Sequence, residues 1–416
     1  MNRRTLGAVV ILALALRLIV IAWVDVRPAN VGEHQQIAAH LTRGEGFSYF
    51  DFGALGPTSI RAPIYPVVLC AIYHAFGIAT PSANAIALLL NALLGATSAG
   101  LIYALTRRAW AGVLWAIWPT QLLAVSLVQP LALGVTLLLI LLLTLRAGRP
   151  IASGFIAGAA VLSESVLLFP TLLLIFATGS LRPRQSLLAL LALTTVTLPW
   201  AYRNTLVHAQ LTAVTTNLGA DLFRGNGPGA TGSQHTGAFR GHESLSRIDQ
   251  LPPPQFDSLK NQPEATRANI LGRWALDWIT THPVSYLTLC ARRTAHTLWL
   301  DWNHPIASSV FNVLTRTAGA AILTCVIFFP RRDPRWLGPI MLTLGLLLAT
   351  IFTMSEARNA IFLDAAVLLS LVWIVDHWRT VKTSGKHFLT TSGTTSAATS
   401  GATSGTTSVH TSVGLD

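Results

Sequence analysis

The sequence is poor in charged residues and in cysteine. Only 11% of its 416 residues are Asp, Glu, Lys or Arg, whereas an ordinary globular domain carries about 25%. This shortage excludes a typical cytosolic enzyme. The three cysteines lie in or beside apolar segments without metal-ligand spacing, so they predict neither a disulfide framework nor a zinc site. The alternation of apolar and polar residues that marks β-barrel strands is also missing.

Apolar residues, by contrast, are abundant and arranged in long runs. They make up 52% of the chain, and the mean hydropathy is +0.53. The first run, Leu6 to Val24, follows Arg3 and Arg4 without a convincing small-residue cleavage site, so we interpret it as a retained membrane helix. Further apolar runs cover 63–78, 82–106, 109–128, 130–145, 151–179, 185–201, 284–300, 306–329, 336–353 and 359–376. The runs predict an all-α polytopic membrane protein with about 9 to 12 hydrophobic helices.

The net charge of +12 is distributed as basic pairs at the ends of apolar runs. This placement follows the positive-inside rule and argues against a nucleic-acid partner. All these pairs share one side only if the stretches 63–78 and 284–300 are not simple crossings. We therefore predict a multi-pass protein of the plasma (inner) membrane, with the N-terminus and the C-terminal tail in the cytoplasm. The basic groups are Arg3/Arg4, Arg107/Arg108, Arg146/Arg149, Arg182/Arg184, Arg331/Arg332/Arg335 and Arg379/Lys382/Lys386.

The polar stretches divide the chain into four predicted parts. Residues 1–201 form an N-terminal transmembrane region whose first loop, 25–62, contains a short helical pattern from Glu33 to Leu41. Residues 202–283 form an extracytoplasmic loop subdomain with an amphipathic helix from Glu264 to Thr281. Residues 284–380 form a C-terminal transmembrane region. Residues 381–416 form a Ser/Thr/Gly-rich tail that we expect to be disordered, because it has too little apolar area to offset the entropy of ordering.

Several segments together resemble a known superfamily. The first loop contains GEHQQIAAHLTRGEGFS and is followed by PTSIRAPIYP; later come LPWAYRN, TTNLGADLFRGNGPGATG, THPVSYL and EARNAIFLDA. In this order they resemble the C-type-fold (GT-C) glycosyltransferases that use lipid-linked sugars, the superfamily of the family 39 protein mannosyltransferases and the aminoarabinose transferases. The resemblance spans residues 1–380. It implies a GT-C-like helical bundle with a small extracytoplasmic loop subdomain.

The same resemblance implies a function. Such enzymes transfer a sugar, with inversion, from a polyprenyl-phosphate donor to an acceptor at the extracytoplasmic face. The expected partners are therefore the polyprenyl-phosphate sugar donor and membrane lipid, with no nucleic acid, while the sugar and the acceptor stay open. No cofactor is expected, and dependence on a divalent metal stays open. His34 and His40 are six residues apart and do not share a helical face, so they do not predict a metal site.

The catalytic position departs from the family pattern. Asn30 stands where the family has its catalytic Asp, His34 replaces the usual Tyr, and Glu33 keeps the second acidic position. An amide cannot accept a proton from an acceptor hydroxyl. Three alternatives follow: Glu33 acts as the base, Asp25 or Asp51 replaces it, or activity is weak or lost. The structural alternative is that the negative charge of Glu33 only stabilises the N-terminus of a helix.

Three arginines at the outer ends of apolar segments are candidate phosphate ligands: Arg61, Arg203 and Arg358. A guanidinium fork suits a phosphate that gains charge as the sugar leaves. The resemblance aligns Arg61 with a basic residue that meets the lipid phosphate and Arg358 with the Arg-Tyr position of the last helix. His34 and Tyr65 complete the predicted binding set. The alternative is that arginines at helix ends extend to lipid headgroups.

One ionisable residue interrupts an apolar run. Glu164, within Ser163-Glu164-Ser165, predicts two short helices that meet at this point. An acid at membrane depth is a functional hypothesis, unless the break reaches the headgroup layer and the acid is simply solvated. Two rival functions also stay open: a transporter or flippase of a lipid-linked substrate, and a catalytically silent GT-C relative. The sequence lacks the internal repeats typical of transporters.

Overall fold

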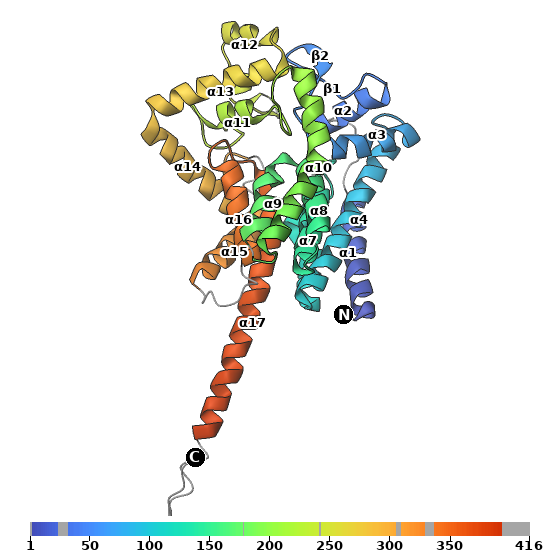
Figure 1. Ribbon diagram of the computed structural model, residues 1–416, viewed down its shortest axis with the longest axis vertical. Coiled ribbons are helices and arrows are strands. Elements are labelled where there is room, and N and C mark those ends of the chain that lie inside the picture. The colour runs from blue at the N-terminus through green and yellow to red at the C-terminus, as the bar shows by residue number, and fades with distance from the viewer. Residues whose placement is uncertain are drawn as a thin grey trace, which may run out of the picture. The chain divides into compact units, whose positions relative to one another are not determined.

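The computed structural model describes residues 2–23, 32–177, 179–240, 243–304, 309–328 and 337–392 (Figure 1). The chain divides into two compact units, Met1–Val372 and Trp373–Asp416. The α-helices are α1 (Arg3–Trp23), α2 (Glu33–Thr42), α3 (Ile64–Phe76), α4 (Pro81–Thr106), α5 (Ala109–Ala116), α6 (Pro119–Ala124), α7 (Leu131–Arg146), α8 (Pro150–Ser163), α9 (Leu168–Ala177), α10 (Pro183–His208), α11 (Leu218–Gly225), α12 (Pro253–Lys260), α13 (Glu264–Thr281), α14 (Pro283–Leu298), α15 (Val310–Phe328), α16 (Leu337–Thr350) and α17 (Ala360–Ser392). The strands are β1 (Ser48–Asp51), β2 (Ala54–Pro57), β3 (Phe239–Arg240) and β4 (Glu243–Ser244), and the 3-10 turns are η1 (Ser165–Leu167), η2 (Ile248–Gln250) and η5 (Ala357–Asn359).

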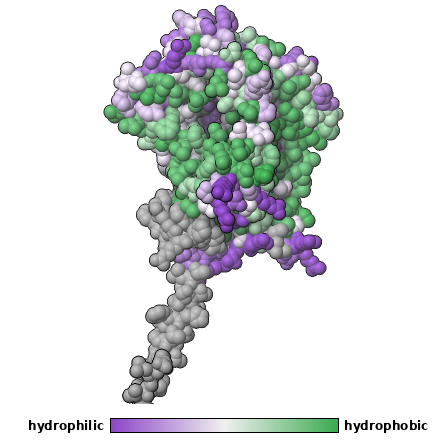
Figure 2. Space-filling view, in the orientation of Figure 1, coloured by the Kyte–Doolittle hydropathy of each residue, from purple (hydrophilic) through white to green (hydrophobic). Residues whose placement is uncertain are grey.

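Four of the described helices are long and apolar enough to cross a membrane: α1, α4, α10 and the Ala360–Arg379 part of α17. The 21 residues of α1 extend about 31 Å, which matches a hydrocarbon core of about 30 Å. Six shorter apolar helical segments accompany them in the described ranges. On the face that Figure 2 shows, hydrophobic residues form a band beneath the hydrophilic end that carries α12 and α13. The predicted fold class, an all-α polytopic membrane protein, is confirmed.

The segments 63–78 and 284–300 were expected not to be simple membrane crossings. In the structure, neither forms a long apolar helix of the kind that spans a membrane. Helix α3 has 13 residues, so it extends only about 20 Å. Helix α14 has 16 residues and carries Arg292, Arg293 and His296 within its length. Their lengths and charges agree with the sidedness that the basic pairs require.

Glycines allow the helices of the membrane region to pack closely. A Cβ on Gly154 of α8 would lie 2.1 Å from the Ala189 carbonyl oxygen of α10, and one on Gly158 would lie 2.7 Å from the Val196 Cβ. Any larger residue would force α8 and α10 apart. Such small-residue interfaces are typical of membrane helices, because close backbone approach maximises van der Waals contact.

Contacts between helix ends bring the basic pairs together. A Cβ on Gly100 near the end of α4 would touch Leu6 and Val10 of α1, so the start of α1 lies beside the end of α4. Arg146 donates through Nη1 to the Leu105 carbonyl at 2.7 Å. Ser153 Oγ donates to Thr144 Oγ1 at 3.0 Å, which joins the start of α8 to the end of α7. Four basic pairs therefore lie at one end of these helices: Arg3/Arg4, Arg107/Arg108, Arg146/Arg149 and Arg182/Arg184.

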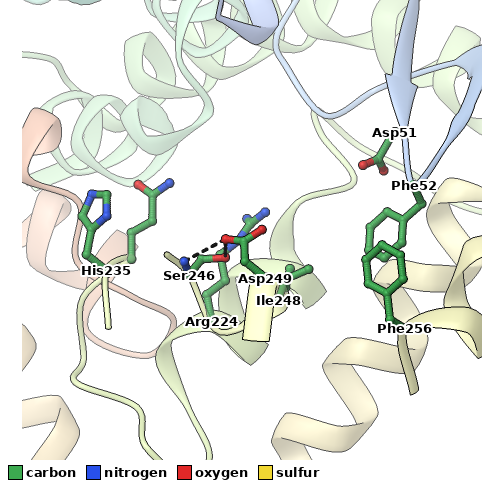
Figure 3. Close-up of a pocket in the computed structure, with 9 residues that line it drawn as sticks. Asp51, Phe52, Arg224, His235, Ser246, Ile248, Asp249 and Phe256 are labelled. Carbon is green, nitrogen blue, oxygen red and sulfur yellow. Dashed lines mark hydrogen bonds between the residues drawn. The ribbon is translucent and has the colours of Figure 1, made fainter. Parts of the chain in front are cut away.

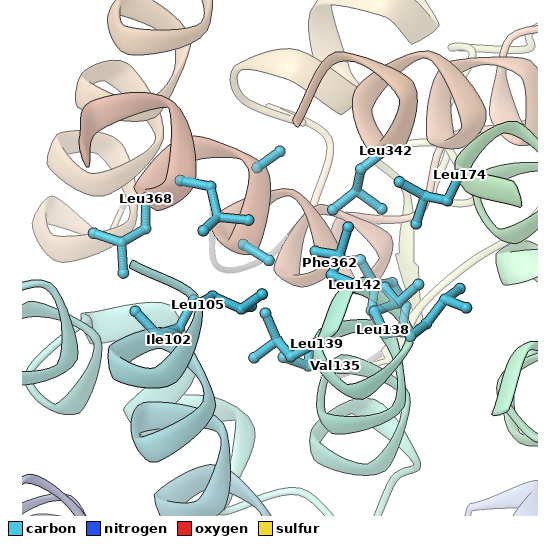
Figure 4. Packing of buried hydrophobic residues seen from close by; sticks show 14 of the residues in the cluster. Ile102, Leu105, Val135, Leu138, Leu139, Leu142, Leu174, Leu342, Phe362 and Leu368 are labelled. Carbon is cyan, nitrogen blue, oxygen red and sulfur yellow. The ribbon is translucent and has the colours of Figure 1, made fainter. Parts of the chain in front are cut away.

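The largest core lies where α4, α7, α9, α16 and the first part of α17 meet (Figure 4). Ile102, Leu138, Leu174, Leu342 and Phe362 are all fully buried in it. These helices come from distant parts of the sequence. The core therefore holds the start of α17 against the N-terminal helices and fixes the segment just before it.

Breaks in the apolar runs follow local sequence. Helix α8 ends at Ser163, Glu164 is extended at φ −148° and ψ 117°, and η1 and α9 follow. The predicted pair of short helices is therefore confirmed. The apolar run 109–128 divides into α5 and α6, because Pro119 holds Trp118 in an extended conformation with ψ 119°.

The polar segments form a small outer region. Helix α13 covers the predicted range Glu264–Thr281, and α2 extends the predicted Glu33–Leu41 helix by one residue. Helices α11 to α13 and the turn η2 share a hydrophobic cluster that includes Phe223 and Leu271. In the predicted tail, α17 continues to Ser392, since adding residues to an existing helix needs no new nucleation. Residues 393–416 lie outside the described ranges.

Candidate active site

Glu33 begins α2 and faces Arg61. The helix start is closed by Gly32, whose N–H donates to the Gln35 Oε1 at 3.1 Å. This places the Glu33 carboxylate in the first turn, where the partial positive charge of the helix end favours it. The Nε of Arg61, three residues before α3, donates to the Glu33 carboxylate and forms an ion pair. The first loop therefore supplies both a carboxylate and a cation to the site.

Arg358 comes from η5, nearly three hundred residues later than Arg61 in the chain. Its Nε donates to the carboxylate of Glu356, which is a second ion pair. The neighbouring Ser355 N–H donates to the Gly232 carbonyl at 2.9 Å, so the segment is attached to the outer loop. The start of α17 on one side and this bond on the other fix the position of Arg358.

The two ion pairs form one electrostatic cluster with Arg224. Burial by itself raises the pKa of Glu33, but the charges of Arg61, Arg358 and Arg224 outweigh it and lower that pKa below its ordinary value. Burial likewise raises the pKa of Glu356, while Arg358 and Arg61 lower it, and the result is again a lowered pKa. Both carboxylates are therefore ionised at neutral pH.

Glu164 adds a third acid to this cluster. Glu164 is 7% exposed, and its Oε1 has no hydrogen-bond partner among the described residues. Its electrostatic neighbours include Arg358 and Arg61. A carboxylate solvated in the headgroup layer would be exposed, so the break in the apolar run brings Glu164 into the site instead.

Helix α11 contributes a further pair that the sequence did not single out. Arg224 donates through Nη1 to Asp221 Oδ1 at 2.9 Å. Burial raises the pKa of Asp221 to about 6, opposed by Arg224 and reinforced by the negative charge of Glu356. Asp221 is thus a carboxylate whose charge changes near neutral pH.

The two principal arginines keep unused donors. Among the described residues, the side-chain hydrogen bonds of Arg61 and Arg358 are made by Nε alone. Their Nη groups donate to none of these residues. Within the described ranges each guanidinium is thus held by one carboxylate while its two terminal nitrogens make no hydrogen bond, an arrangement that suits bidentate binding of an anion.

His34 lies next to this cluster, and Tyr65 lies behind His34. The ring of His34 is 5% exposed, and neither ring nitrogen has a partner in the described part of the chain. Burial, together with the charges of Arg61 and Arg358, holds the pKa of His34 well below its ordinary value, so the ring is neutral. Tyr65 of α3 packs edge-on against it, with ring centroids 5.6 Å apart.

Arg203 lies apart from the other predicted arginines. Its Nη1 donates to the Thr58 carbonyl at 2.7 Å and to Ser59 Oγ at 3.0 Å, and its Nη2 donates to the Phe47 carbonyl at 3.2 Å. The guanidinium also stacks on Trp200, 4.9 Å from the ring centroid. The structure brings Arg61 and Arg358 to Glu33, but it directs Arg203 to backbone carbonyls.

The alternative acids of the first loop have different positions. Asn30 and Asp25 lie outside the described residues. Asp51, at the end of β1, pairs with Arg267 of α13 at 2.5 Å. Burial raises the pKa of Asp51 despite this pairing.

Three residues of the cluster were missed because their signals are weak in sequence. Glu356 opens the quoted segment EARNAIFLDA, and Asp221 and Arg224 lie in TTNLGADLFRGNGPGATG. Nothing in their spacing points to Glu33. A charge pair three residues apart on a short helix, as in Asp221 and Arg224, is the one available signal, and solvated helices show it equally often.

The described residues hold no group of three or more His, Cys, Asp or Glu side chains arranged to bind a metal ion. No family model matches the chain, and no curated protein matches it in sequence. Two solved structures are similar, both of ArnT from Cupriavidus metallidurans. The apo structure is 14% identical, covers 87% of this chain and 76% of ArnT, and has a TM-score of 0.39. The structure bound to undecaprenyl phosphate is also 14% identical at a TM-score of 0.39, covering 86% of this chain and 77% of ArnT.

Proposed function

We propose that the protein is a membrane glycosyltransferase that moves a sugar from a polyprenyl-phosphate donor to an acceptor at the extracytoplasmic face. One observation carries the proposal: Arg61 and Arg358 are each held by a carboxylate through Nε, their Nη groups donate to no described residue, and the charges of both act on Glu33. The ordered sequence resemblance to GT-C enzymes supports the same function. The basic pairs lie at the opposite ends of α8 and α10, which by the positive-inside rule supports a site at the outer face.

The arginines suit the leaving phosphate. When the bond between the anomeric carbon and the phosphate oxygen breaks, negative charge grows on the phosphate. Two guanidinium forks in a largely buried site stabilise that charge much more strongly than water does. The long apolar helices below the site offer a path for the polyprenyl chain.

Glu33 is the proposed general base. It accepts the proton of the acceptor hydroxyl while that oxygen attacks the anomeric carbon from the side opposite the phosphate, and the polyprenyl phosphate departs. In the resting site Glu33 is a weak base, because three arginines lower its pKa. A phosphate that draws Arg61 away from Glu33, and adds a negative neighbour, raises this pKa again. Donor binding would thus activate the base.

The test is donor-dependent transfer of a radiolabelled sugar by the purified protein, with Glu33→Gln as the decisive variant. We expect turnover to fall by about 10² to 10⁴ fold, the usual contribution of a general base. Glu45→Gln is the matched control, since Glu45 lies in the same loop, is 41% exposed and pairs with His40 at 2.5 Å. Equal turnover of Glu33→Gln and the wild type would remove Glu33 as the base. If the wild type binds donor but transfers no label, the protein is a silent relative.

A further inference from the structure

A cavity of about 340 Å³ lies beside the arginine cluster (Figure 3). It is enclosed by the β1–β2 hairpin, α11, η2, α12 and the loop that follows α11. Arg224 lines this cavity and also acts electrostatically on Glu33 and Glu356. The cavity therefore adjoins the proposed site of transfer, and its volume falls within the range of small-molecule sites, about 300 to 1,000 Å³.

Hydrogen-bond acceptors dominate the polar part of the wall. Asp51 and Asp249 contribute carboxylates, and Gln234, His235 and Ser246 contribute further polar groups. Asp249 receives hydrogen bonds from the Ser246 N–H at 2.8 Å and hydroxyl at 2.7 Å, both on Oδ2. Its Oδ1 accepts no hydrogen bond from the described residues and can accept one from a ligand hydroxyl, which binds well to a charged acceptor.

The charges of the wall oppose an anionic ligand. Asp51 is neutralised by Arg267 at 2.5 Å, and Arg224 by Asp221 at 2.9 Å. Asp249 has no cationic partner among the described residues. A phosphorylated or carboxylated group would therefore meet an uncompensated negative charge at this wall, whereas a neutral hydroxylated group would not.

One end of the cavity is an aromatic wall held by an unusual turn. The rings of Phe52 and Phe256 are stacked, with centroids 5.0 Å apart. Phe52 and Gly53 form the two-residue turn between β1 and β2 with φ of 49° and 87°. Such turns favour Asn-Gly, and a bulky residue at positive φ is rare. Phe52 thus occupies a turn position that local chemistry disfavours, and its side chain contributes an apolar surface to the cavity.

From these features we infer that the cavity is the acceptor site and that it takes a neutral sugar residue. The carboxylate and polar groups receive its hydroxyls, and apolar C–H groups of the sugar contact the Phe52–Phe256 wall, in which Phe52 lies between Phe256 and the Arg267 guanidinium. The assignment of the cavity as the acceptor site rests on the proposed transferase function. The binding preference for a neutral sugar rests on the cavity alone.

The test measures binding without donor. The full chain in lipid nanodiscs is titrated with methyl glycosides of common hexoses, and with glucose 6-phosphate as the anionic probe, by saturation-transfer NMR. We expect a neutral glycoside to bind and glucose 6-phosphate to bind at least tenfold more weakly. Asp249→Asn and Phe52→Asn should each weaken glycoside binding about tenfold.

Matched controls separate binding from folding. Asp257→Asn changes an exposed acid on the same helix as Phe256, and Phe50→Asn changes a phenylalanine that is 56% exposed on the same hairpin. Both should bind like the wild type. Phe52→Asn should keep its fold, since Asn suits the positive φ of that turn, so its loss of binding would reflect the lost wall.

Three results would overturn the inference: no glycoside binds, glucose 6-phosphate binds more tightly, or the two cavity variants bind like their controls. The proposed function fails differently, through absent donor-dependent transfer. A wild type that binds glycoside but transfers no sugar would keep the sugar site and reject the enzyme.

Discussion

Two groups of polar residues at the helix ends opposite the basic pairs use arginine in opposite ways. Around Arg203, the guanidinium Nη groups are bound to the carbonyls of Thr58 and Phe47 and to the Ser59 hydroxyl. Around Arg61 and Arg358, Nε alone donates to another side chain within the described residues, and the terminal nitrogens donate to none of them. The difference teaches that position at a helix end is not enough to select a candidate phosphate ligand. The number of donors left after folding is a sharper criterion, and it favours Arg61 and Arg358 over Arg203.

The Arg203 group has the features of a structural joint. Glu264 of α13 accepts from the Ser59 N–H at 2.9 Å and from the hydroxyls of Thr58 and Thr216, both at 2.5 Å. His208 Nε2 lies 2.9 Å from Ser59 Oγ. These bonds join the first loop, α10 and α13. The group thereby holds the loop that presents Glu33 and Arg61.

The largest expected effect comes from removing an available fork. Arg358→Gln should lower kcat/KM for sugar transfer by about 10² to 10³ fold, because one cation no longer stabilises the charge on the leaving phosphate. Arg358→Lys should lose less, since a lysine keeps the charge but not the bidentate geometry. The measurement is initial-rate transfer of radiolabel by purified variants. Equal rates for Arg358→Gln and the wild type would erase the distinction between the two groups.

The second prediction concerns Arg203, whose replacement should lower stability and leave sugar transfer nearly unchanged. Arg203→Gln should reduce the free energy of unfolding by about 3 kcal/mol, because carbonyl and hydroxyl acceptors lose a charged donor. Transfer per folded molecule should change little. Thermal unfolding in detergent and transfer rates normalised to folded protein measure the two quantities separately. A stable Arg203→Gln variant with transfer reduced a hundredfold would make Arg203 a phosphate ligand, as its sequence position first suggested.

Sequence patterns predicted those parts of this comparison that depend on local chemistry. Helix α13 and the break at Glu164 follow from hydrophobic periodicity and polar interruptions, which neighbours in the chain determine. Ordered motifs singled out Glu33, Arg61 and Arg358 as candidates, and the structure brings them into one charge cluster, while their catalytic and binding roles stay predictions. The hydrogen-bond partners of Arg203 could not be predicted, because its Nη groups donate to the backbone carbonyls of Thr58 and Phe47. Every residue possesses such a carbonyl, so the sequence does not mark the partners.

The third prediction concerns an acid that competes with the donor. Glu164 lies beside Arg61 and Arg358 with one oxygen unpartnered among the described residues. Glu164→Gln removes a negative charge next to the phosphate position, so donor affinity should rise about tenfold. Equilibrium binding of a polyprenyl phosphate to the nanodisc-embedded protein measures it. Weaker binding would show instead that Glu164 holds Arg61 and Arg358 in position. These two arginines would then resemble the structural Arg203 group.

The smallest expected effect tests whether Arg224 belongs with the available arginines or with the committed ones. Its partner Asp221 has a pKa raised by burial to about 6, compared with about 3.9 in an unfolded chain. The folded state therefore binds the proton more tightly, so stability is highest at low pH and falls as pH rises from about 4 to about 6. Since the Asp221 side chain is 27% exposed, we expect this loss to be about 1 kcal/mol after allowance for solvent screening. Asp221→Asn should remove this loss, so its gain in stability over the wild type should be larger at about pH 7.5 than at about pH 5, where the loss is only partly developed, while Asp257→Asn should leave the profile unchanged. Thermal midpoints at the two pH values measure the difference.

A variant that is less stable than the wild type at both pH values would mean that Asp221 and Arg224 form a structural pair like the Arg203 group. A gain in stability near neutral pH would mean that the ionised Asp221 destabilises the folded protein. Such a cost is expected of a group that has a chemical role.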